Sequence, residues 1–214
     1  MHSEPSSRPL QVAVLISGGG TTLKNLIDLI EKSQLPVQIG LVISSKKSAR
    51  GLAFAAEAKI PSLIVCRQDH LTPDAYRDAI FEPIRRSGVS YVVMGGFLQH
   101  LLIPSDFQNR VLNIHPSLIP AFCGQGFYGL KVHQAAIDYG VKISGCTVHF
   151  VDDHYDHGPV ILQRSCPVLD DDTAESLQQR VFGLECEALP ETLRWIAQNR
   201  IRISADGRRV IELR

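Results

Sequence analysis

The feature that most constrains this chain is a strict alternation of short apolar runs with amphipathic stretches from residue 11 to residue 94. The first run, residues 11–16, is apolar and partly β-branched and stops at a glycine turn, as a fully buried strand does. Parallel strands need long crossover connections, which are usually helical. The alternation therefore predicts an α/β fold with a single doubly wound, mostly parallel sheet and helices on both faces. We expect one domain over residues 11–214 after a flexible segment over residues 1–10.

The later elements follow from the same patterns of hydrophobicity and punctuation. The expected strands cover residues 11–16, 37–44, 62–66, 91–94, 111–115, 145–150 and 159–168. The expected helices include one that follows the glycine turn, and others over residues 49–58, 73–87, 132–139 and 173–198. Thr21 or Thr22 is expected to cap the first helix, and Asp172 with Glu175 stands at capping-box spacing for the last. The Arg-rich tail, residues 200–214, alternates weakly like an edge hairpin.

Composition disfavours several classes of partner. Lys and Arg number 22 and Asp and Glu also number 22, so there is no global field to hold a polyanion, and we expect no nucleic acid partner. No apolar run approaches the ~20 residues that a bilayer requires, and the first ten residues are polar, so we expect no membrane partner and a cytoplasmic location. The five cysteines form no Cys-x-x-Cys pair, which favours buried free thiols over disulfides or structural zinc.

The glycine turn is the first candidate binding element. It contains Gly18, Gly19 and Gly20, followed by Thr21 and Thr22 at the start of the expected helix. Its backbone N–H groups, the helix dipole and two hydroxyls can converge on a phosphate, although a tight turn alone would also explain the glycines. A dinucleotide site would need a third spaced glycine and a later acidic residue, and an ATP site would need Gly-Lys-Ser/Thr. With dinucleotide and ATP sites disfavoured, the remaining candidate ligand for the turn is a terminal monophosphate, as on a ribonucleotide.

The second candidate element is the segment Asn-x-His-Pro. Asn113 and His115 alternate along the expected strand and share one face, while Pro116 holds His115 in an extended conformation. At the carboxyl end of a strand in an open α/β sheet, such side chains face the crevice where ligands bind. An amide and an imidazole on a strand are also common as structural residues, so a third group is needed.

The loop over residues 151–159, rich in acids and histidines, can supply that group, because loops of this kind carry chemistry more often than packing. Metal binding by His149, His154, His157 and the carboxylates is conceivable. However, the sequence has no helical pair of ligands at i, i+4 and no closely spaced cysteine ligand to support it. We therefore expect no metal.

Four segments together resemble one enzyme family. They are residues 15–20 (Leu-Ile-Ser-Gly-Gly-Gly), 113–120 (Asn-Ile-His-Pro-Ser-Leu-Ile-Pro), 145–151 (Gly-Cys-Thr-Val-His-Phe-Val) and 156–161 (Asp-His-Gly-Pro-Val-Ile). The chain resembles the folate-dependent formyltransferase superfamily and, within it, the phosphoribosylglycinamide formyltransferase family, over about residues 12–201. The resemblance implies an enzyme of de novo purine biosynthesis, monomeric or homodimeric. The enzyme would pass the formyl group of its co-substrate 10-formyltetrahydrofolate to the amine of glycinamide ribonucleotide.

The resemblance also implies roles for particular residues. Asn113 and His115 would donate hydrogen bonds to the oxyanion, and Asp156 would orient His115 and an ordered water that carries the proton to the departing folate nitrogen. The substrate-binding residues would be Gly18, Gly19, Gly20, Thr21, Thr22, Pro116 and Glu185. The folate-binding residues would be Leu98, Gln99, His100, Leu101, Val151 and Asp152.

The chain departs from the family pattern at several positions. The glycine turn lacks the usual asparagine, Gln99 replaces a frequent arginine, and Phe182 stands where a polar residue is common. The stretch between Pro120 and His133 is a few residues longer than usual. These departures bear on the identity of the acceptor more than on the reaction class.

Several other functions share parts of the pattern. A formyltetrahydrofolate hydrolase has the same catalytic trio but usually carries a regulatory domain before it, whereas only about ten residues precede the first expected strand. Formylation of initiator methionyl-tRNA would call for an added RNA-binding domain and a basic surface. Sugar-nucleotide formyltransferases lack a glycine turn of this kind. A formyltransferase acting on another amine and a non-enzymatic ligand-binding module remain as alternatives.

Overall fold

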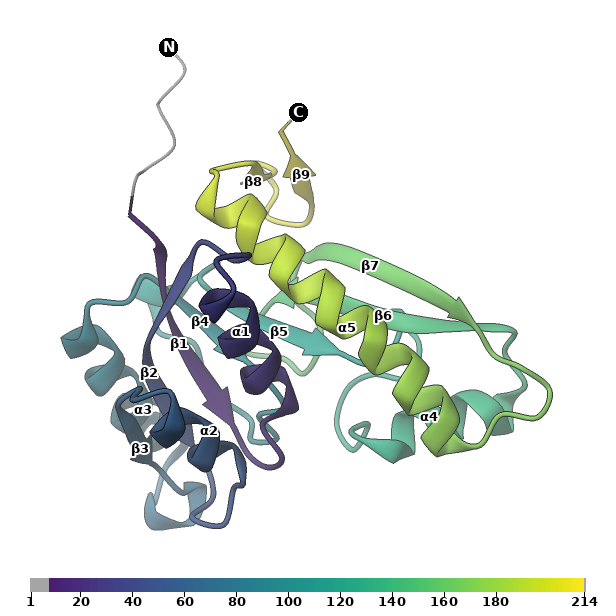
Figure 1. Ribbon diagram of the computed structural model, residues 1–214, viewed down its shortest axis with the longest axis horizontal. Coiled ribbons are helices and arrows are strands. Elements are labelled where there is room, and N and C mark those ends of the chain that lie inside the picture. Colours follow the sequence, from purple (N-terminus) through teal and green to yellow (C-terminus); the bar gives the residue numbers. More distant parts are fainter. Residues whose placement is uncertain (1–7, 214) are drawn as a thin grey trace.

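The computed structural model describes residues 8–213, so most of the expected segment over residues 1–10 lies outside the described part. Seven strands form one mixed sheet in the order β3-β2-β1-β4-β5-β6-β7, as drawn in Figure 1. The strands are β1 (Leu10–Ile16), β2 (Val37–Ser44), β3 (Ser62–Ile64), β4 (Tyr91–Met94), β5 (Val111–His115), β6 (Ile143–Phe150) and β7 (Val160–Pro167). Strands β1 to β5 pair in parallel, whereas β6 and β7 join antiparallel. The doubly wound, mostly parallel fold predicted from the sequence is thus confirmed.

Helices connect the strands and cover both faces of the sheet. They are α1 (Thr21–Glu31), α2 (Gly51–Glu57), α3 (Pro73–Ser87), α4 (Leu130–Tyr139) and α5 (Ala174–Ala197), with short 3₁₀ turns η1 (Arg67–Asp69) and η2 (Ser105–Phe107). Figure 1 shows α1 and α5 side by side on one face. Strand β1 is apolar throughout because both of its faces are buried. Val12 and Val14 pack on the side of α1 and α5, while Ala13 and Leu15 pack on the side of α3.

The topology places one crevice in the sheet. The chain proceeds outward from β1 through β2 to β3 and then returns to β4 on the other side of β1, so the direction of winding reverses between β1 and β4. Ligands of open α/β sheets bind outside the carboxyl ends of the strands at such a switch point. The carboxyl ends of β1, β4 and β5 lead into the glycine turn, Gly95–Gly96 and Pro116, respectively.

Both expected helix caps were wrong. The N-cap of α1 is Gly20, which has a φ of 72° and no side-chain cap, because a left-handed residue is required where the turn crosses α2. A Cβ on Gly20 would lie only 2.4 Å from the Cα of Gly51. At the start of α5 the capping box is formed by Thr173 and Ser176. Asp172 instead binds Arg180, 2.6 Å away, and accepts from the Ser176 hydroxyl at 2.7 Å rather than from a backbone N–H of the first turn.

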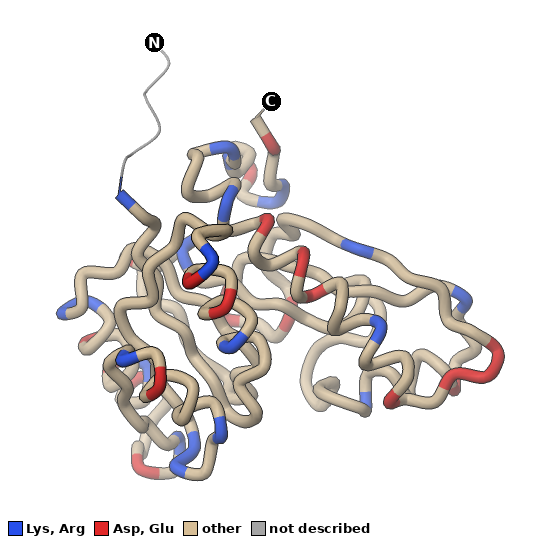
Figure 2. The backbone as a smooth tube through the Cα atoms, viewed as in Figure 1, with Lys and Arg blue, Asp and Glu red and all other residues tan. Residues whose placement is uncertain are grey.

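The other boundaries agree with the sequence to within three residues. The expected strand over residues 62–66 ends at Ile64, because η1 begins three residues later, and α4 begins at Leu130 rather than at residue 132. The tail does form a hairpin, β8 (Ile201–Ile203) with β9 (Val210–Glu212), but it is a separate two-stranded sheet. Acidic and basic positions are interspersed over most of the described fold (Figure 2). Within residues 8–213, no helix has both the length and the apolar character that a membrane crossing requires.

The antiparallel pair β6–β7 depends on a missing side chain at Gly145. A Cβ there would lie 2.0 Å from the carbonyl oxygen of Arg164 on the neighbouring strand, so Gly145→Ala must push two backbones apart. We expect this variant to lose about 3 kcal/mol of unfolding free energy. Gly183→Ala is the matched control: a Cβ at Gly183 meets nothing within 4 Å, and alanine favours the helix by up to about 1 kcal/mol. Denaturant unfolding of both variants measures the difference, and equal stabilities would contradict this view of the strand pair.

Candidate active site

One large cavity lies at the carboxyl ends of β1, β4 and β5. Its volume is about 790 Å³, which is within the range of small-molecule sites. Its walls come from the glycine turn, the strand ends, a loop over residues 124–129, the loop that bears Asp156, and helices α4 and α5. The residues predicted from the sequence that line it are Gly18, Gly19, Gly20, Thr21, Thr22, Leu98, Asn113, His115, Pro116, Asp156 and Glu185.

The glycine turn presents its backbone to this cavity. Gly18 and Gly19 are exposed, and a Cβ on either would meet no other atom within 4 Å, so an anion can approach the turn closely. Before the turn, the hydroxyls of Ser17 and Ser45 lie 2.6 Å apart, and the Leu98 N–H donates to the Ser17 hydroxyl at 2.9 Å. These buried bonds fix the start of the turn against the two neighbouring strand ends. Helix α1 begins directly after it, so the unpaired N–H groups of its first turn face the same space.

The structure brings together the three residues that the family resemblance implies as catalytic. Nδ1 of His115 lies 3.5 Å from Oδ2 of Asp156, and the Asn113 amide nitrogen donates to Oδ1 of Asp156 at 3.3 Å. The backbone N–H of Gly124 donates to Oδ2 of the same carboxylate at 2.9 Å. Asp156 adopts a φ of 50°, a left-handed conformation that is uncommon outside glycine and that these contacts hold in place.

A fourth residue, His149, completes this cluster and was considered in the sequence only as a metal ligand. His149 stands opposite Asn113 in the antiparallel pair β5–β6. Its Nδ1 donates to the carbonyl of Phe150 at 2.7 Å, so its Nε2 is the acceptor for the Asn113 amide at 3.2 Å. Both N–H bonds of the Asn113 amide therefore have partners within the protein. The sequence did not indicate this role, because it depends on the register between β5 and β6, and the antiparallel pairing of these strands was not predicted.

The environment sets the protonation states of this cluster. Burial lowers the pKa of His115, although the Asp156 charge and the carbonyl of Phe122 act in the opposite direction. Nε2 of His115 donates to that carbonyl at 3.0 Å, which leaves Nδ1 as the unprotonated nitrogen facing Asp156. Burial alone would raise the pKa of Asp156, but His149, His115 and the Gly124 N–H together hold it below its usual value. At neutral pH the pair is a neutral imidazole beside a carboxylate, ready to accept one proton.

Glu185, on α5, forms part of the cavity wall, and its environment differs from that of Asp156. Burial raises the pKa of its carboxyl to about 8, and within residues 8–213 no side chain or loop N–H donates to it. It lies on one helix face with Gln178 and Phe182, at i, i+4 and i+7, and all three line the cavity. That spacing is the signal by which Gln178 could have been found in the sequence. His133 and the glycine-rich loop over residues 124–129 were also not predicted to line the site.

Most of the residues predicted to bind folate surround a second, much smaller pocket. Its volume is only about 60 Å³, room for a few water molecules and far less than a bicyclic ring. The expected residues that line it are Gln99, His100, Leu101, Val151 and Asp152, while Leu98 faces the large cavity instead.

Two contacts tie the Asp153 segment to residues next to this pocket. Nε2 of His100 donates to the carbonyl of Asp153 at 2.9 Å, and the Asp153 side chain accepts from the N–H of Ile103 at 2.9 Å. A pocket of this volume admits a ring system only if its walls, which include much of the loop over residues 151–156, move apart.

The chain matches one known protein family over most of its length. The family described as "Formyl transferase" matches residues 10–193, which is most of the chain. This chain belongs to the formyl transferase family.

Related formyl transferases with known names agree in sequence and in structure. A glycinamide ribonucleotide transformylase 1 from Symbiobacterium toebii superposes with a TM-score of 0.90 at 37% identity, covering 98% of this chain and 96% of that one. A phosphoribosylglycinamide formyltransferase from Haemophilus influenzae is 34% identical over 90% of each chain. A trifunctional purine biosynthetic protein adenosine-3 from Drosophila pseudoobscura is 38% identical over 94% of this chain, which spans only 14% of that protein.

The raised pKa of Glu185 predicts how stability depends on pH in this formyl transferase. A carboxyl with a pKa of about 8 when folded and 4.5 when unfolded stays protonated only in the folded chain, so the free energy of unfolding falls as the pH rises through that interval. Glu185→Gln removes this loss. We expect the unfolding free energy of the variant, relative to that of the parent, to increase by about 2 kcal/mol between pH 5 and pH 9. This is less than the whole pKa shift corresponds to, because the carboxyl also faces the cavity.

Chemical unfolding at several pH values measures this change. Glu187→Gln, an exposed change on the same helix, is the control and should follow the parent. A constant difference between Glu185→Gln and the parent at all pH values would contradict the assignment of a buried, protonated Glu185.

Proposed function

We propose that this chain transfers the formyl group of 10-formyltetrahydrofolate to the amine of glycinamide ribonucleotide, a step of de novo purine biosynthesis. The observation that carries the proposal is that Asn113, His115 and Asp156 meet at the wall of the same cavity as the glycine turn. The names of the relatives support formyl transfer and the assignment of the acceptor. Only small-molecule substrates are required.

The reaction needs a donor for a developing oxyanion. An amine that attacks the formyl carbon forms a C–N bond while the carbonyl oxygen gains the electron pair and the negative charge. Asn113 is the donor: its bonds to His149 and Asp156, at 3.2 and 3.3 Å, are at the long end for N–H donors. An oxyanion forms a stronger, charge-assisted bond and can draw one N–H toward itself. His149 and Asp156 meanwhile hold the amide in the orientation that makes this possible.

The reaction also needs a path for one proton. The attacking amine becomes an ammonium, and the departing folate nitrogen must gain a proton as its C–N bond breaks. Nδ1 of His115 is unprotonated and faces the Asp156 carboxylate, which stabilises the imidazolium formed when the ring accepts a proton. His115, oriented by Asp156 and assisted by an ordered water, then delivers that proton to the folate nitrogen. An α-amino group has a pKa of about 8, so part of the nucleophile is already neutral at pH 7.

The acceptor would lie along the large cavity. Its phosphate would bind the N–H groups and hydroxyls of Gly18, Gly19, Gly20, Thr21 and Thr22. Its ribose hydroxyls would lie toward Glu185, a protonated carboxyl that can both donate and accept a hydrogen bond. Pro116 shapes the wall between them. Phe182, where relatives commonly have a polar residue, contributes an apolar contact to the same wall.

The folate would enter between two segments, residues 98–101 and 151–156, where Gln99, Leu101 and Val151 line the small pocket. Because that pocket is small, the loop that bears Asp152 has to move outward as the pterin binds. The chemistry proposed here uses no metal. A cytoplasmic location and a monomeric or homodimeric state remain predictions.

The experiment that tests the proposal mixes the purified chain with 10-formyltetrahydrofolate, with and without glycinamide ribonucleotide, and follows folate release by absorbance. We expect release that depends on the acceptor and yields one formylated product per folate. Release that ignores the acceptor would identify a hydrolase, and release only with a different amine would reassign the acceptor. No release with any amine offered would favour a ligand-binding module.

Removal of the oxyanion donor should have a large and specific effect. We expect Asn113→Ala to lower kcat by about 100- to 1,000-fold, the cost typical of one oxyanion donor, with little change in folding. Gln134→Ala removes an exposed amide on α4 and is the matched control, for which kcat should equal that of the parent. Steady-state rates with saturating acceptor provide the measurement, and a loss below about tenfold would contradict the role of Asn113.

A further inference from the structure

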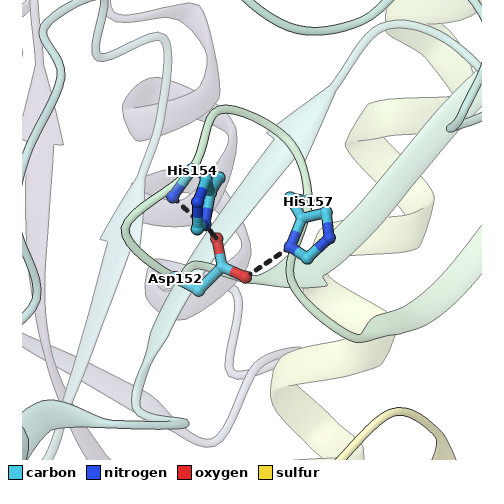
Figure 3. A group of neighbouring side chains, drawn as sticks. All are labelled: Asp152, His154 and His157. Atoms are coloured by element: carbon cyan, nitrogen blue, oxygen red, sulfur yellow. Dashed lines mark hydrogen bonds and ion pairs between the residues drawn. The ribbon is translucent and has the colours of Figure 1, made fainter.

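Three potential metal ligands gather on the loop between β6 and β7, outside the catalytic cluster. Asp152, His154 and His157 each point a ligand atom into one small region (Figure 3), and these atoms all lie within 4.8 Å of one another. Nδ1 of His157 is 2.7 Å from Oδ2 of Asp152, and Nδ1 of His154 is 3.8 Å from Oδ1. None of the steps proposed above uses either histidine. We name Asp152, His154 and His157 the loop triad.

The chemistry of the loop triad matches a divalent transition metal. Two imidazole nitrogens and one carboxylate oxygen form a donor set suited to Zn²⁺, Co²⁺ or Ni²⁺, and three protein ligands leave a position for water. The ligand atoms of a tetrahedral zinc site are about 3.3 Å apart, so the spread of up to 4.8 Å must contract somewhat. The side chains can make that adjustment because His154 and His157 are exposed, at 77% and 71%.

The surrounding charge also favours a cation. With both histidines neutral, the loop triad carries one negative charge, and the adjacent Asp153 adds a second. The sequence contains no lysine or arginine from residue 143 to residue 163 that could compete as a partner for these carboxylates. An exposed pair of charges and a site open to solvent allow a metal to enter without any rearrangement of the core.

We propose that the loop triad is a binding site for a divalent transition metal, and that a metal bound there holds the loop over residues 151–157 in its present conformation, in which the neighbouring pocket is too small for a pterin. The second part of this proposal, that the bound metal hinders folate binding, rests on the proposed function. The loop carries both Asp156, at the catalytic cluster, and Val151 and Asp152, at the small folate pocket.

This restraint follows from how the loop is attached. Its ligands lie on both sides of Tyr155, and the Tyr155 ring packs on His100 with ring centroids 4.8 Å apart. His100 also binds the carbonyl of Asp153, so the segment facing the folate pocket is already held at one point. A metal that joins residues 152, 154 and 157 would cross-link the loop and oppose the outward movement that a pterin requires. The metal would therefore act as a competitive inhibitor with respect to folate.

The first experiment measures binding without reference to activity. The full chain, freed of any histidine tag and dialysed against a chelator, is titrated with Co²⁺ while its d–d absorption is recorded. We expect one equivalent to bind with a nitrogen- and oxygen-ligated spectrum. His154→Asn and His157→Asn should each weaken binding by at least about 100-fold, because losing even a second-shell partner of a metal costs 10- to 100-fold.

Two controls separate the site from general surface binding. His70→Asn changes a histidine outside the loop, and Asp170→Asn changes a carboxylate that is 93% exposed and pairs with Lys142. Both should bind Co²⁺ as the parent does. Circular dichroism and unfolding curves should show that His154→Asn and His157→Asn remain folded, since both side chains are exposed. No Co²⁺ binding by the parent, or equal binding by both loop variants, would overturn the site.

The second experiment measures the consequence for catalysis. We expect Zn²⁺ to raise the apparent KM for 10-formyltetrahydrofolate in the parent, with kcat nearly unchanged, and to have no such effect in His157→Asn. If Co²⁺ binds at the loop triad and Zn²⁺ leaves KM unchanged, the locking of the loop is wrong although the site stands. A chain that transfers no formyl group even without metal contradicts the proposed function instead, while the Co²⁺ titration still decides the site.

Discussion

The carboxylate of Asp156 is the interaction on which the rest of the site depends. It is contacted by two side chains of β5, by His149 on β6, and by a backbone N–H from the glycine-rich loop before α4. These segments are far apart in the chain, and each alone could adopt several arrangements. Because one carboxylate contacts all of these segments, it fixes them in a single arrangement. Asp156 itself adopts a left-handed backbone conformation, which is the local strain associated with these contacts. The change from parallel to antiparallel pairing after β5 makes the contact possible, because it returns the chain to the catalytic strand.

Burial raises the pKa of both acids of this one cavity, but only at Asp156 is that effect overcome by neighbouring groups. Asp156 is surrounded by donors and stays ionised, whereas Glu185 has no such donors and keeps its proton at neutral pH. The cavity therefore has a charged end, where a proton must be handled, and a neutral end, where hydroxyl groups can be recognised. Divergent pKa values in neighbouring carboxyls are a general mark of divided roles in enzymes. Here, burial alone acts on Glu185, whereas His149, His115 and the Gly124 N–H offset it at Asp156.

The sequence was sufficient for the features that depend on local periodicity. The bounds of β2, α3, β4 and β5 were predicted to the residue, because residues typical of turns or proline lie next to their ends. Strand alternation placed Asn113 and His115 on one face, and a family resemblance added Asp156 and the catalytic roles. The structure does bring the three residues together. The features that were missed are set by tertiary contacts. Gly20 replaces a threonine cap because the start of α2 packs against it, and His149 becomes part of the site only through strand register. At the start of α5, Thr173 is the cap, while Asp172 binds Arg180 and the Ser176 hydroxyl.

The contact between Gly20 and Gly51 has a consequence for how this protein can vary. Each backbone occupies the volume in which the other's side chain would be, since a Cβ on Gly51 would likewise approach the Cα of Gly20 to 2.9 Å. Random drift at either position is therefore blocked unless the two helix starts separate, and separation would widen the anion turn. The start of α2, which has no part in the proposed chemistry, is thereby held under the same selection as the glycine turn, so that lineages changing their acceptor would have to alter both together.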